Sequence, residues 1–387
     1  MTRIYLIKKL SPWMINELLA FSQFVQFRLI LLRTPPTVYK KNMEELEKRG
    51  IEIFIKPFNK NPDLKKSLYS LLFILQHIHC FWGIKNIVFG IKAIRWFIIM
   101  DEKVIPENSS IHPQFATQTS IIALMSKNFL KNVEYFFTFH AHDIYYKNRW
   151  FTLLVNKSKA ALSISEFNID YVKKSYKNVD ASKVVISRLG IFIPKFTAYL
   201  KREILTIGFL SWWEEKKGIF ILLNTIRILS QKNKLSLKLM LAGDGPLKEK
   251  VLSFIRANSL NKYIVDMGKI FGDAKQKFFG DIDIFCLPSI PAKKDMDGIP
   301  VVLMEALSYG VPIISTNISG IPEICKHNYN GLLIPSGDSA ALSAAIMEFY
   351  NMDDRSFQKY KKHAYESSKE YDIVQNSKNK LKVLGWI

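Results

Sequence analysis

The stretch from Leu287 to Gly310 constrains the fold more than any other part of this 387-residue chain. The apolar run Ile282–Leu287 predicts a buried strand that ends at Pro288, and a polar loop follows it. A helix is expected to begin at Pro300, because the N–H that proline lacks would have no partner at a first helical position. Strand, loop and helix in this order build parallel sheets, which bind ligands at the carboxyl ends of their strands.

The start of this predicted helix has the composition of an anion site. Gly298 lets the backbone come close to a ligand, and the N–H groups of Val301 and Val302 are expected at the positive helix end. Asp297 in the loop and Glu305 in the helix provide an acidic residue on each side. Phosphate on the N–H groups and hydroxyls on the carboxylates suit a sugar nucleotide.

These residues resemble the E-x7-E region of the retaining glycosyltransferases of family 4, which reads Glu-Gly-hydrophobic-Pro, four residues, Glu-Ala. Asp297 replaces the first Glu, and Glu305 is the second at the family spacing. The resemblance continues through Gly310–Thr316, Gly320–Ile324 and Asn330–Asp338. It implies an α/β protein of the GT-B fold, with two Rossmann-like doubly wound domains that face each other across a cleft.

The resemblance also implies how the donor is held. In the family an Arg and a Lys contact the donor diphosphate; Lys217 aligns with the lysine, Lys216 is a close substitute, and Phe209 stands in place of the arginine. Such a contact can be worth about 10²–10³ in rate, because the leaving diphosphate gathers negative charge and neither metal nor cofactor is expected. The implied donor-binding residues are Lys216, Gly298, Ile299, Pro300, Val301 and Val302, with Met267 and Gly268 facing the nucleobase.

The first half of the chain carries a further part of the resemblance. Ile111 is expected to open a helix that runs to about Phe129, and Glu134–Phe139 predicts a strand. The strand leads into Thr-Phe-His-Ala-His-Asp-Ile, which resembles the family's Thr-x-His-Ala-x-Asp-Ile. This implies that His140 contacts the donor sugar, although a histidine at a strand end can also be structural. The implied catalytic residues are Lys217, Glu305 on the ribose, Asp297 on the sugar, and His140.

Alternating strands and helices predict a parallel sheet in the first half. Lys8–Pro12 follows the first predicted strand without a glycine, so a nucleotide is not expected there. The predicted division is an acceptor-side domain over 1–195, a linker over 196–202, a nucleotide-sugar-binding domain over 203–365, and a helical tail over 366–387 that crosses back toward the first domain.

The net charge of +21 lies mostly in residues 1–200, which hold 29 Lys and Arg against 14 Asp and Glu. No nucleic-acid-binding signature accompanies this charge. The apolar, aromatic stretch 68–100 contains Lys85, Lys92 and Arg95, and polar residues interrupt it too often for a membrane span. Two interpretations remain open: contact with an anionic membrane surface, or two buried helices.

The three cysteines, Cys80, Cys286 and Cys325, are too widely spaced for a disulfide framework or a zinc site. The first twenty residues lack the apolar core of a signal peptide. A cytoplasmic protein, peripheral at the inner membrane face, is therefore expected. The segments 281–283 and 295–297 each spell D-x-D, which by itself is a weak metal signature.

The resemblance implies a retaining transferase that moves a hexose-type sugar from a nucleotide-sugar donor to a lipid-linked or surface-glycan acceptor, as in lipopolysaccharide and other polysaccharide biosynthesis. Phe209 and Asp297 motivate an alternative, a degenerate GT-B protein that binds nucleotide or glycan without turnover. An epimerase or a phosphorylase on the same fold is a third possibility.

Overall fold

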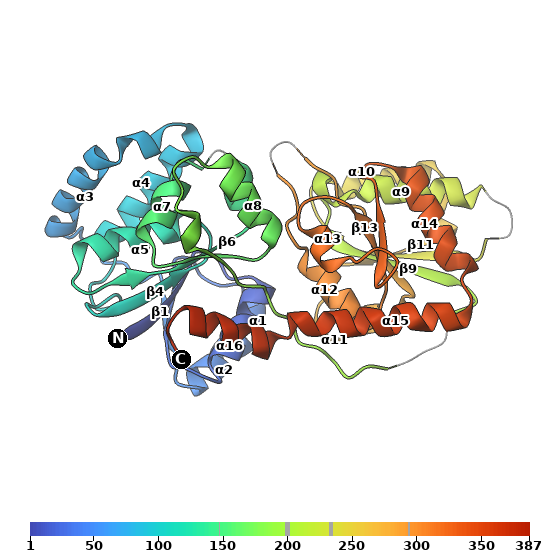
Figure 1. Ribbon diagram of the computed structural model, residues 1–387, viewed down its shortest axis with the longest axis horizontal. Coiled ribbons are helices and arrows are strands. Elements are labelled where there is room, and N and C mark those ends of the chain that lie inside the picture. Colours follow the sequence, from blue (N-terminus) through green and yellow to red (C-terminus); the bar gives the residue numbers. More distant parts are fainter. Residues whose placement is uncertain (147, 198–201, 232–234, 293–294) are drawn as a thin grey trace. The chain divides into compact units, whose positions relative to one another are not determined.

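The computed structural model describes residues 1–146, 148–197, 202–231, 235–292 and 295–387 (Figure 1). The chain divides into two compact units: unit 1 contains residues 1–190 and 373–387, and unit 2 contains residues 191–372. Positions 198–201 of the predicted linker lie outside the described residues. Of the predicted tail, residues 366–372 are part of unit 2, whereas the remainder is part of unit 1.

Unit 1 is built on parallel strands in two sheets, ordered β3-β2-β1-β4-β5 and β6-β7-β8. A parallel bridge between Gln114 and Thr138 joins the end of β4 to β6. The strands are β1 Thr2–Ile7, β2 Arg28–Leu31, β3 Glu52–Ile55, β4 Ser109–Pro113, β5 Glu134–Tyr135, β6 Phe137–Phe139, β7 Ala161–Ser163 and β8 Val184–Ile186. Ile111 therefore does not open a helix: it lies inside β4, opposite Ile4 of β1.

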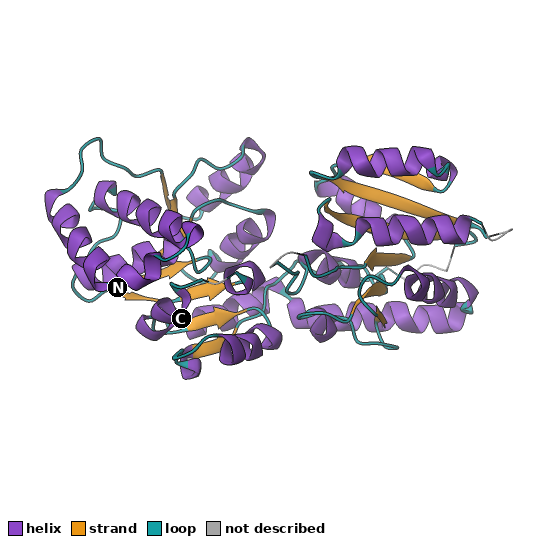
Figure 2. Cartoon of the chain, turned by 90° about the horizontal axis from the view of Figure 1, so that it is seen from above, coloured by secondary structure: helices purple, strands orange, loops and turns teal. Residues whose placement is uncertain are grey.

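Helices cover both faces of the unit 1 sheet, as Figure 2 shows. Alternate residues of a strand point to opposite faces, so Ile4 and Leu6 of β1 join one core, and Tyr5 and Ile7 join the other. The helices are α1 Pro12–Phe21, α2 Lys40–Lys48, α3 Leu64–Gln76, α4 Ile84–Ile99, α5 Gln118–Phe129, α6 Ala141–Tyr145, α7 Phe151–Lys157, α8 Glu166–Ser175 and α16 Ile373–Val383.

Unit 2 is a single six-stranded parallel sheet of order β11-β10-β9-β12-β13-β14. Its strands are β9 Leu205–Trp212, β10 Leu237–Asp244, β11 Ile264–Gly268, β12 Ile284–Leu287, β13 Ile313–Thr316 and β14 Gly331–Ile334. Its helices are α9 Ile219–Ser230, α10 Lys248–Ala257, α11 Gly272–Asp281, α12 Val301–Ser308, α13 Ile321–Ile324, α14 Ser339–Asn351 and α15 Asp354–Ser368.

The strand order gives each unit one point where the winding direction reverses. In unit 2 the chain proceeds from β9 outward through β10 and β11, and then returns to β12 on the other side of β9. In unit 1 the same reversal lies between β1 and β4. Loops that leave the two central strands diverge there, and the crevice beyond their carboxyl ends is where doubly wound sheets bind ligands. The topology thus indicates one candidate site in each unit.

The apolar stretch 68–100, for which two interpretations were open, lies in α3 and α4. The outer faces of these two helices are exposed. The side chains of Leu68 and Ile84 are 63% and 82% exposed. The interpretation of two buried helices is therefore wrong. Within the described ranges, every helix is too short or too polar to cross a bilayer.

Candidate functional site

Helix α12 begins at Val301, one residue later than predicted. Pro300 is its N-cap, because a ψ of 123° keeps this residue extended although its φ is −65°. The Pro300 carbonyl accepts the Leu303 N–H at 3.0 Å. In the described part of the chain, the N–H groups of Val301 and Val302 meet no acceptor. These two amides, at the positive end of the helix, can bind an anion.

The loop after β9 is held against the loop after β12 by a close backbone contact. Gly218 has a left-handed φ of +65°, and a Cβ atom there would lie 1.8 Å from the carbonyl oxygen of Pro288. The N–H of Ile290 donates to the Lys216 carbonyl at 2.9 Å. Only glycine fits such a position, so Gly218 brings the two lysines before it to the reversal point of the sheet.

Lys217 and Asp297 form the central ion pair of this site. The Lys217 Nζ lies 2.5 Å from Asp297 Oδ1, and the Ser289 hydroxyl donates to Asp297 Oδ2 at 2.7 Å. The two side chains are 16% and 7% exposed. Because an ammonium group carries three protons, Lys217 retains donors for a further acceptor. The pair therefore holds a partly exposed cation beside the loop that leads into α12.

Lys216 makes a second ion pair next to the first. Its Nζ lies 2.9 Å from Asp295 Oδ2 and 3.5 Å from Glu214 Oε1. Burial opposes the charge of Lys216, but the hydrogen bond that it donates to Asp295 and the charges of Asp297, Asp295 and Glu214 together raise the pKa of this lysine. Both lysines predicted for the diphosphate thus lie at this site.

Hydroxyl groups brace the loop after β12. Thr316 Oγ1 donates to the Ser289 carbonyl and Ser315 Oγ to the Leu287 carbonyl, both at 2.6 Å. Ser289 was not predicted as a partner of Asp297, although it lies within the stretch 287–310 that predicts the site. A serine directly after a buried strand of a parallel sheet is a signal that could have identified it.

Other predicted donor-binding residues lie in α12 and at the carboxyl end of β11. Glu305, in α12, pairs with Lys275 of α11, with Oε1 and Nζ 2.6 Å apart. Met267 and Gly268 end the edge strand β11, where Gly268 has a φ of +58° and donates its N–H to Asp266 at 2.9 Å. Lys275 was not predicted, because the pairing depends on how α11 packs beside α12.

Phe209 and the D-x-D segments do not extend the site. Phe209 lies within β9 opposite Leu241, and its side chain is fully buried, so this position supplies no cation. Asp283 is buried and accepts hydrogen bonds from Arg202 and from the Thr206 N–H, each at 2.8 Å. Asp281 pairs with Lys277. These carboxylates are thus bound by protein cations and amides.

His140 lies in unit 1, directly after β6, as the N-cap of α6. Its backbone N–H donates to the Asp143 carboxylate at 2.9 Å, so Asp143 holds the turn. The ring packs against Trp13 and Phe115, with centroids 5.1 and 4.8 Å away. Burial, together with the smaller effect of the positive charge of Lys380, lowers the pKa of His140 to about 3. The imidazole is therefore neutral near pH 7 and can donate or accept one hydrogen bond at each nitrogen.

A buried polar network lies beneath His140. The Gln114 side-chain oxygen is 3.3 Å from His140 Nε2, and the Gln114 amide donates to Tyr5 and, at 3.1 Å, to Glu17. Lys380 of α16 pairs with Glu17 at 2.7 Å, with the two side chains 2% and 7% exposed. Residues from the beginning, the middle and the end of the chain thus meet at the reversal point of unit 1.

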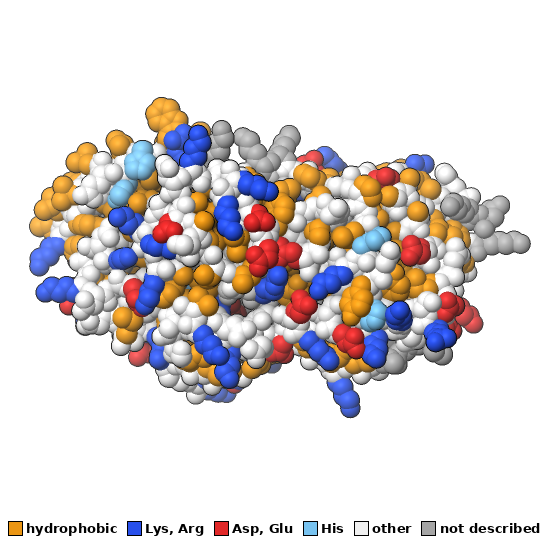
Figure 3. Space-filling view, in the orientation of Figure 1, with side chains coloured by type: hydrophobic (Ala, Val, Ile, Leu, Met, Phe, Trp, Pro, Cys, Tyr) orange, Lys and Arg blue, Asp and Glu red, His pale blue; other side chains and the backbone are white. Residues whose placement is uncertain are grey.

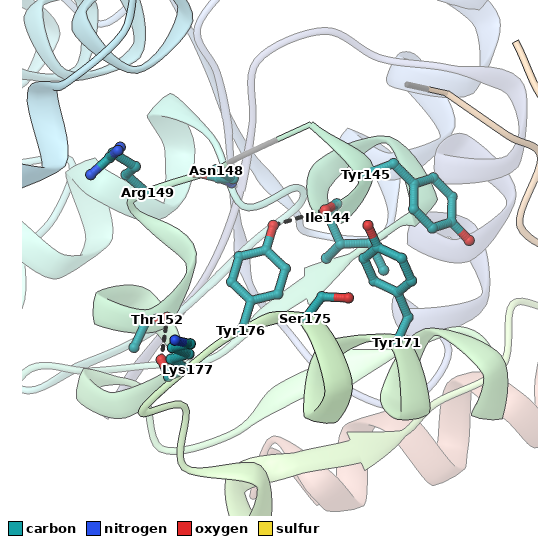
Figure 4. Close-up of a pocket in the computed structure, with 9 residues that line it drawn as sticks. All are labelled: Ile144, Tyr145, Asn148, Arg149, Thr152, Tyr171, Ser175, Tyr176 and Lys177. Carbon is teal, nitrogen blue, oxygen red and sulfur yellow. Dashed lines mark hydrogen bonds between the residues drawn. The ribbon is translucent and has the colours of Figure 1, made fainter. Parts of the chain in front are cut away.

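A separate pocket of about 390 Å³ lies between α6, α7 and α8 of unit 1 (Figure 4). Tyr145, Tyr171 and Tyr176 contribute to its wall, and Tyr176 donates its hydroxyl to the Ile144 carbonyl at 2.8 Å. No predicted site residue lines this pocket. It is therefore distinct from the arrangement around Lys217 and from His140.

The strand order and the comparison with solved structures define the class of the protein. The chain aligns over its whole length with all of HepE from Anabaena, solved in complex with UDP, with a TM-score of 0.71 at 15% identity. Such a likeness shows the fold, which is GT-B. Residues 201–352 match the model of the family described as glycosyl transferases group 1.

Two curated relatives are both named as biosynthesis glycosyltransferases. The chain is 34% identical to the amylovoran biosynthesis glycosyltransferase AmsK of Erwinia amylovora over 171 residues, 43% of this chain and 42% of that protein. It is 30% identical to the putative colanic acid biosynthesis glycosyltransferase WcaL of Escherichia coli over 205 residues, 51% of this chain and 49% of that protein. The match spans less than half of the length of these relatives.

Proposed function

We propose that this chain is a retaining glycosyltransferase that moves a hexose-type sugar from a nucleotide-sugar donor to a lipid-linked or surface-glycan acceptor in polysaccharide biosynthesis. One observation carries the proposal: a partly exposed lysine, paired with Asp297, lies beside the start of α12, whose first amides are open. The names of AmsK and WcaL, and the UDP bound to HepE, support this assignment.

The chemistry follows from the charge that develops on the leaving group. As the bond between the sugar's anomeric carbon and the diphosphate breaks, the nucleoside diphosphate gains negative charge. Lys217, Lys216 and the N–H groups of Gly298, Ile299, Val301 and Val302 would stabilise it without reorganising. The acceptor oxygen bonds to the anomeric carbon, and its proton passes to a phosphate oxygen of the donor. No protein nucleophile, metal or cofactor takes part in this step.

The other predicted residues would position the donor. Glu305 would accept hydrogen bonds from the ribose hydroxyls, in exchange for or beside its contact with Lys275. Asp297 would contact the sugar, and the backbone at Met267 and Gly268 would face the nucleobase. His140 would contribute a neutral hydrogen-bonding group to the sugar. A cytoplasmic location at the inner membrane face would bring such an enzyme to a lipid-linked acceptor.

The alternative is a GT-B protein that binds nucleotide or glycan without turnover. Two observations favour it: Phe209 supplies no cation at the place of the family's arginine, and Asp297 is already occupied by Lys217 and Ser289. The two candidates differ in whether bond cleavage accompanies binding.

A donor hydrolysis assay separates these candidates. Wild type should hydrolyse a nucleotide sugar whose nucleotide (UDP, GDP or ADP) raises its melting temperature. Lys217→Ala should lower the hydrolysis rate by about 10²–10³, and Glu305→Ala should lower it about tenfold or more. Lys277→Ala, which removes an exposed lysine of α11, is the control and should match wild type. If wild type and all variants are equally inactive while nucleotide still binds, the assignment as a binding protein is correct. If no nucleotide binds, both candidates fail.

A further inference from the structure

Helix α3 exposes apolar side chains on the face that points away from the core. Its buried residues are Lys66, Ser70 and Phe73, whereas its outer face consists largely of leucines. Five of these side chains are between 55% and 84% exposed: Leu64, Leu68, Leu71, Leu72 and Leu75. A helix that only needs to fold in water places such residues inward. Contiguous exposed apolar surface of this kind marks an interaction site.

The exposed apolar face continues across the turn into α4. The exposed side chains there are Ile78, Trp82, Ile84, Ile87, Val88 and Ile91. We call the outer face of residues 64–95 the α3–α4 surface. Figure 3, in the orientation of Figure 1, shows hydrophobic side chains gathered over the part of unit 1 that contains α3.

Local packing holds this surface in place. A Cβ atom at Gly90 would lie 2.4 Å from the Phe81 ring and 2.9 Å from the Trp150 ring, so both rings pack directly on the α4 backbone. Asn86 donates to the Trp82 carbonyl at 2.9 Å, and its own carbonyl accepts from Trp150. Trp82, 74% exposed, therefore projects from a fixed turn.

The charge of this segment indicates the kind of partner. Residues 64–100 contain five Lys and Arg and no Asp or Glu. Lys65, Lys85, Lys92 and Arg95 are exposed, whereas Lys66 is buried and donates to the Met100 carbonyl at 2.7 Å. Apolar side chains flanked by exposed cations, with a tryptophan among them, are typical of helices that lie in the interface of an anionic bilayer.

We propose that the α3–α4 surface docks the protein on an anionic lipid bilayer, with leucines, isoleucines and Trp82 entering the headgroup boundary and the four exposed cations contacting lipid headgroups. This deepens the proposed function, since it names the surface that would meet a membrane carrying the acceptor. The docking itself needs neither donor nor turnover, so its failure is distinguishable from failure of the transferase assignment.

Vesicle flotation with the full chain tests the proposal. Wild type should float with vesicles of phosphatidylcholine and phosphatidylglycerol, and should bind less at high salt and on phosphatidylcholine alone. Leu71→Ser with Leu75→Ser should weaken binding at least about tenfold. Lys92→Gln and Arg95→Gln should each weaken it about fivefold.

Matched controls lie in unit 2. Trp212→Ser removes a tryptophan that is 54% exposed, and Lys359→Gln with Lys362→Gln removes two exposed cations of α15. These variants should bind vesicles as wild type does, whereas Trp82→Ser should not. Absence of wild-type flotation at low salt overturns the proposal, and so does equal loss in the controls. Sedimentation velocity tests a further outcome. If wild type is a dimer, and the leucine variant is a monomer that still floats as wild type does, the surface binds a second copy of the chain, and the membrane proposal is overturned.

Discussion

The two units reverse their strand order at the same place but use that place differently. In unit 2 the reversal point between β9 and β12 presents Lys217, partly exposed, beside open amides. In unit 1 the reversal point between β1 and β4 is filled by Tyr5, Glu17, Gln114 and Lys380. One fold thus gives a charged edge open to an anion in one unit and a packed polar core in the other.

The difference originates in the loop after the first strand of each sheet. In unit 2, Gly218 lets the chain pass against Pro288, so the lysines before it stay at the surface and α9 begins after them. In unit 1 the loop contains no glycine, and α1 starts at Pro12 and carries Glu17 into the core. A buried carboxylate needs a partner there, which Lys380 supplies.

The strongest test removes the partner of the buried carboxylate in unit 1. Lys380→Met leaves Glu17 without its cation and should lower the free energy of unfolding by about 3–5 kcal/mol. Adding Glu17→Gln should restore much of the loss, and Lys382→Met, an exposed change in the same helix, should have little effect. Urea denaturation measures all three. An unaltered midpoint for Lys380→Met would show that the polar core of unit 1 tolerates a lone charge.

The next test compares the lysines that follow the first strand of each unit. Lys217→Met should lower donor turnover by about 10²–10³ and reduce the thermal shift by the nucleoside diphosphate. Lys8→Met, which removes the 3.3 Å contact to Gln118 in unit 1, should leave that thermal shift unchanged. A larger loss of nucleotide binding from Lys8→Met would break the assignment of the nucleotide to unit 2.

The glycine that keeps the unit 2 site open gives a smaller expected effect. Gly218→Ala should lower the free energy of unfolding by at least about 2 kcal/mol, because alanine is strained at a φ of +65° and its Cβ would meet the Pro288 carbonyl. Gly280→Ala, in α11 with open space around it, should stabilise by about 0.5 kcal/mol. Equal melting temperatures for the two variants would contradict the close contact.

The smallest expected effect concerns pH and unit 1. Folding holds the pKa of His140 at about 3, below its ordinary value near 6.5, so the unfolded chain binds the proton first. The stability that His140 contributes is present above pH 6.5 and is lost as the pH falls toward 3. His140→Gln should reduce the loss of stability between pH 6.5 and 4.5 by about 1–2 kcal/mol. A parallel pH profile for the variant would show that the folded protein accommodates the charged imidazole.

Much of the unit 2 site could be predicted because its signals are local. Pro288, Gly298 and Pro300 mark the end of a strand and the start of a helix, and the two acidic residues lie at a fixed spacing from them. The error at Pro300 was a single residue, since proline suits both the N-cap and the first helical position, and the extended ψ decided between them. Ile111 was misassigned because its strand is specified by pairing with β1, which lies more than 100 residues away.

The sequence by itself determined the alternation of strands and helices, the GT-B resemblance, and the positions of Lys217 and Asp297 in loops that follow strands, because glycine, proline and apolar runs act on neighbouring residues. The tertiary structure alone decided the contacts Lys380–Glu17, Lys275–Glu305 and Gln114–His140. It also decided that α3 exposes its leucines. Which face of an apolar helix is buried, and which distant charges meet, depend on packing between elements, and periodicity along the chain does not record that packing.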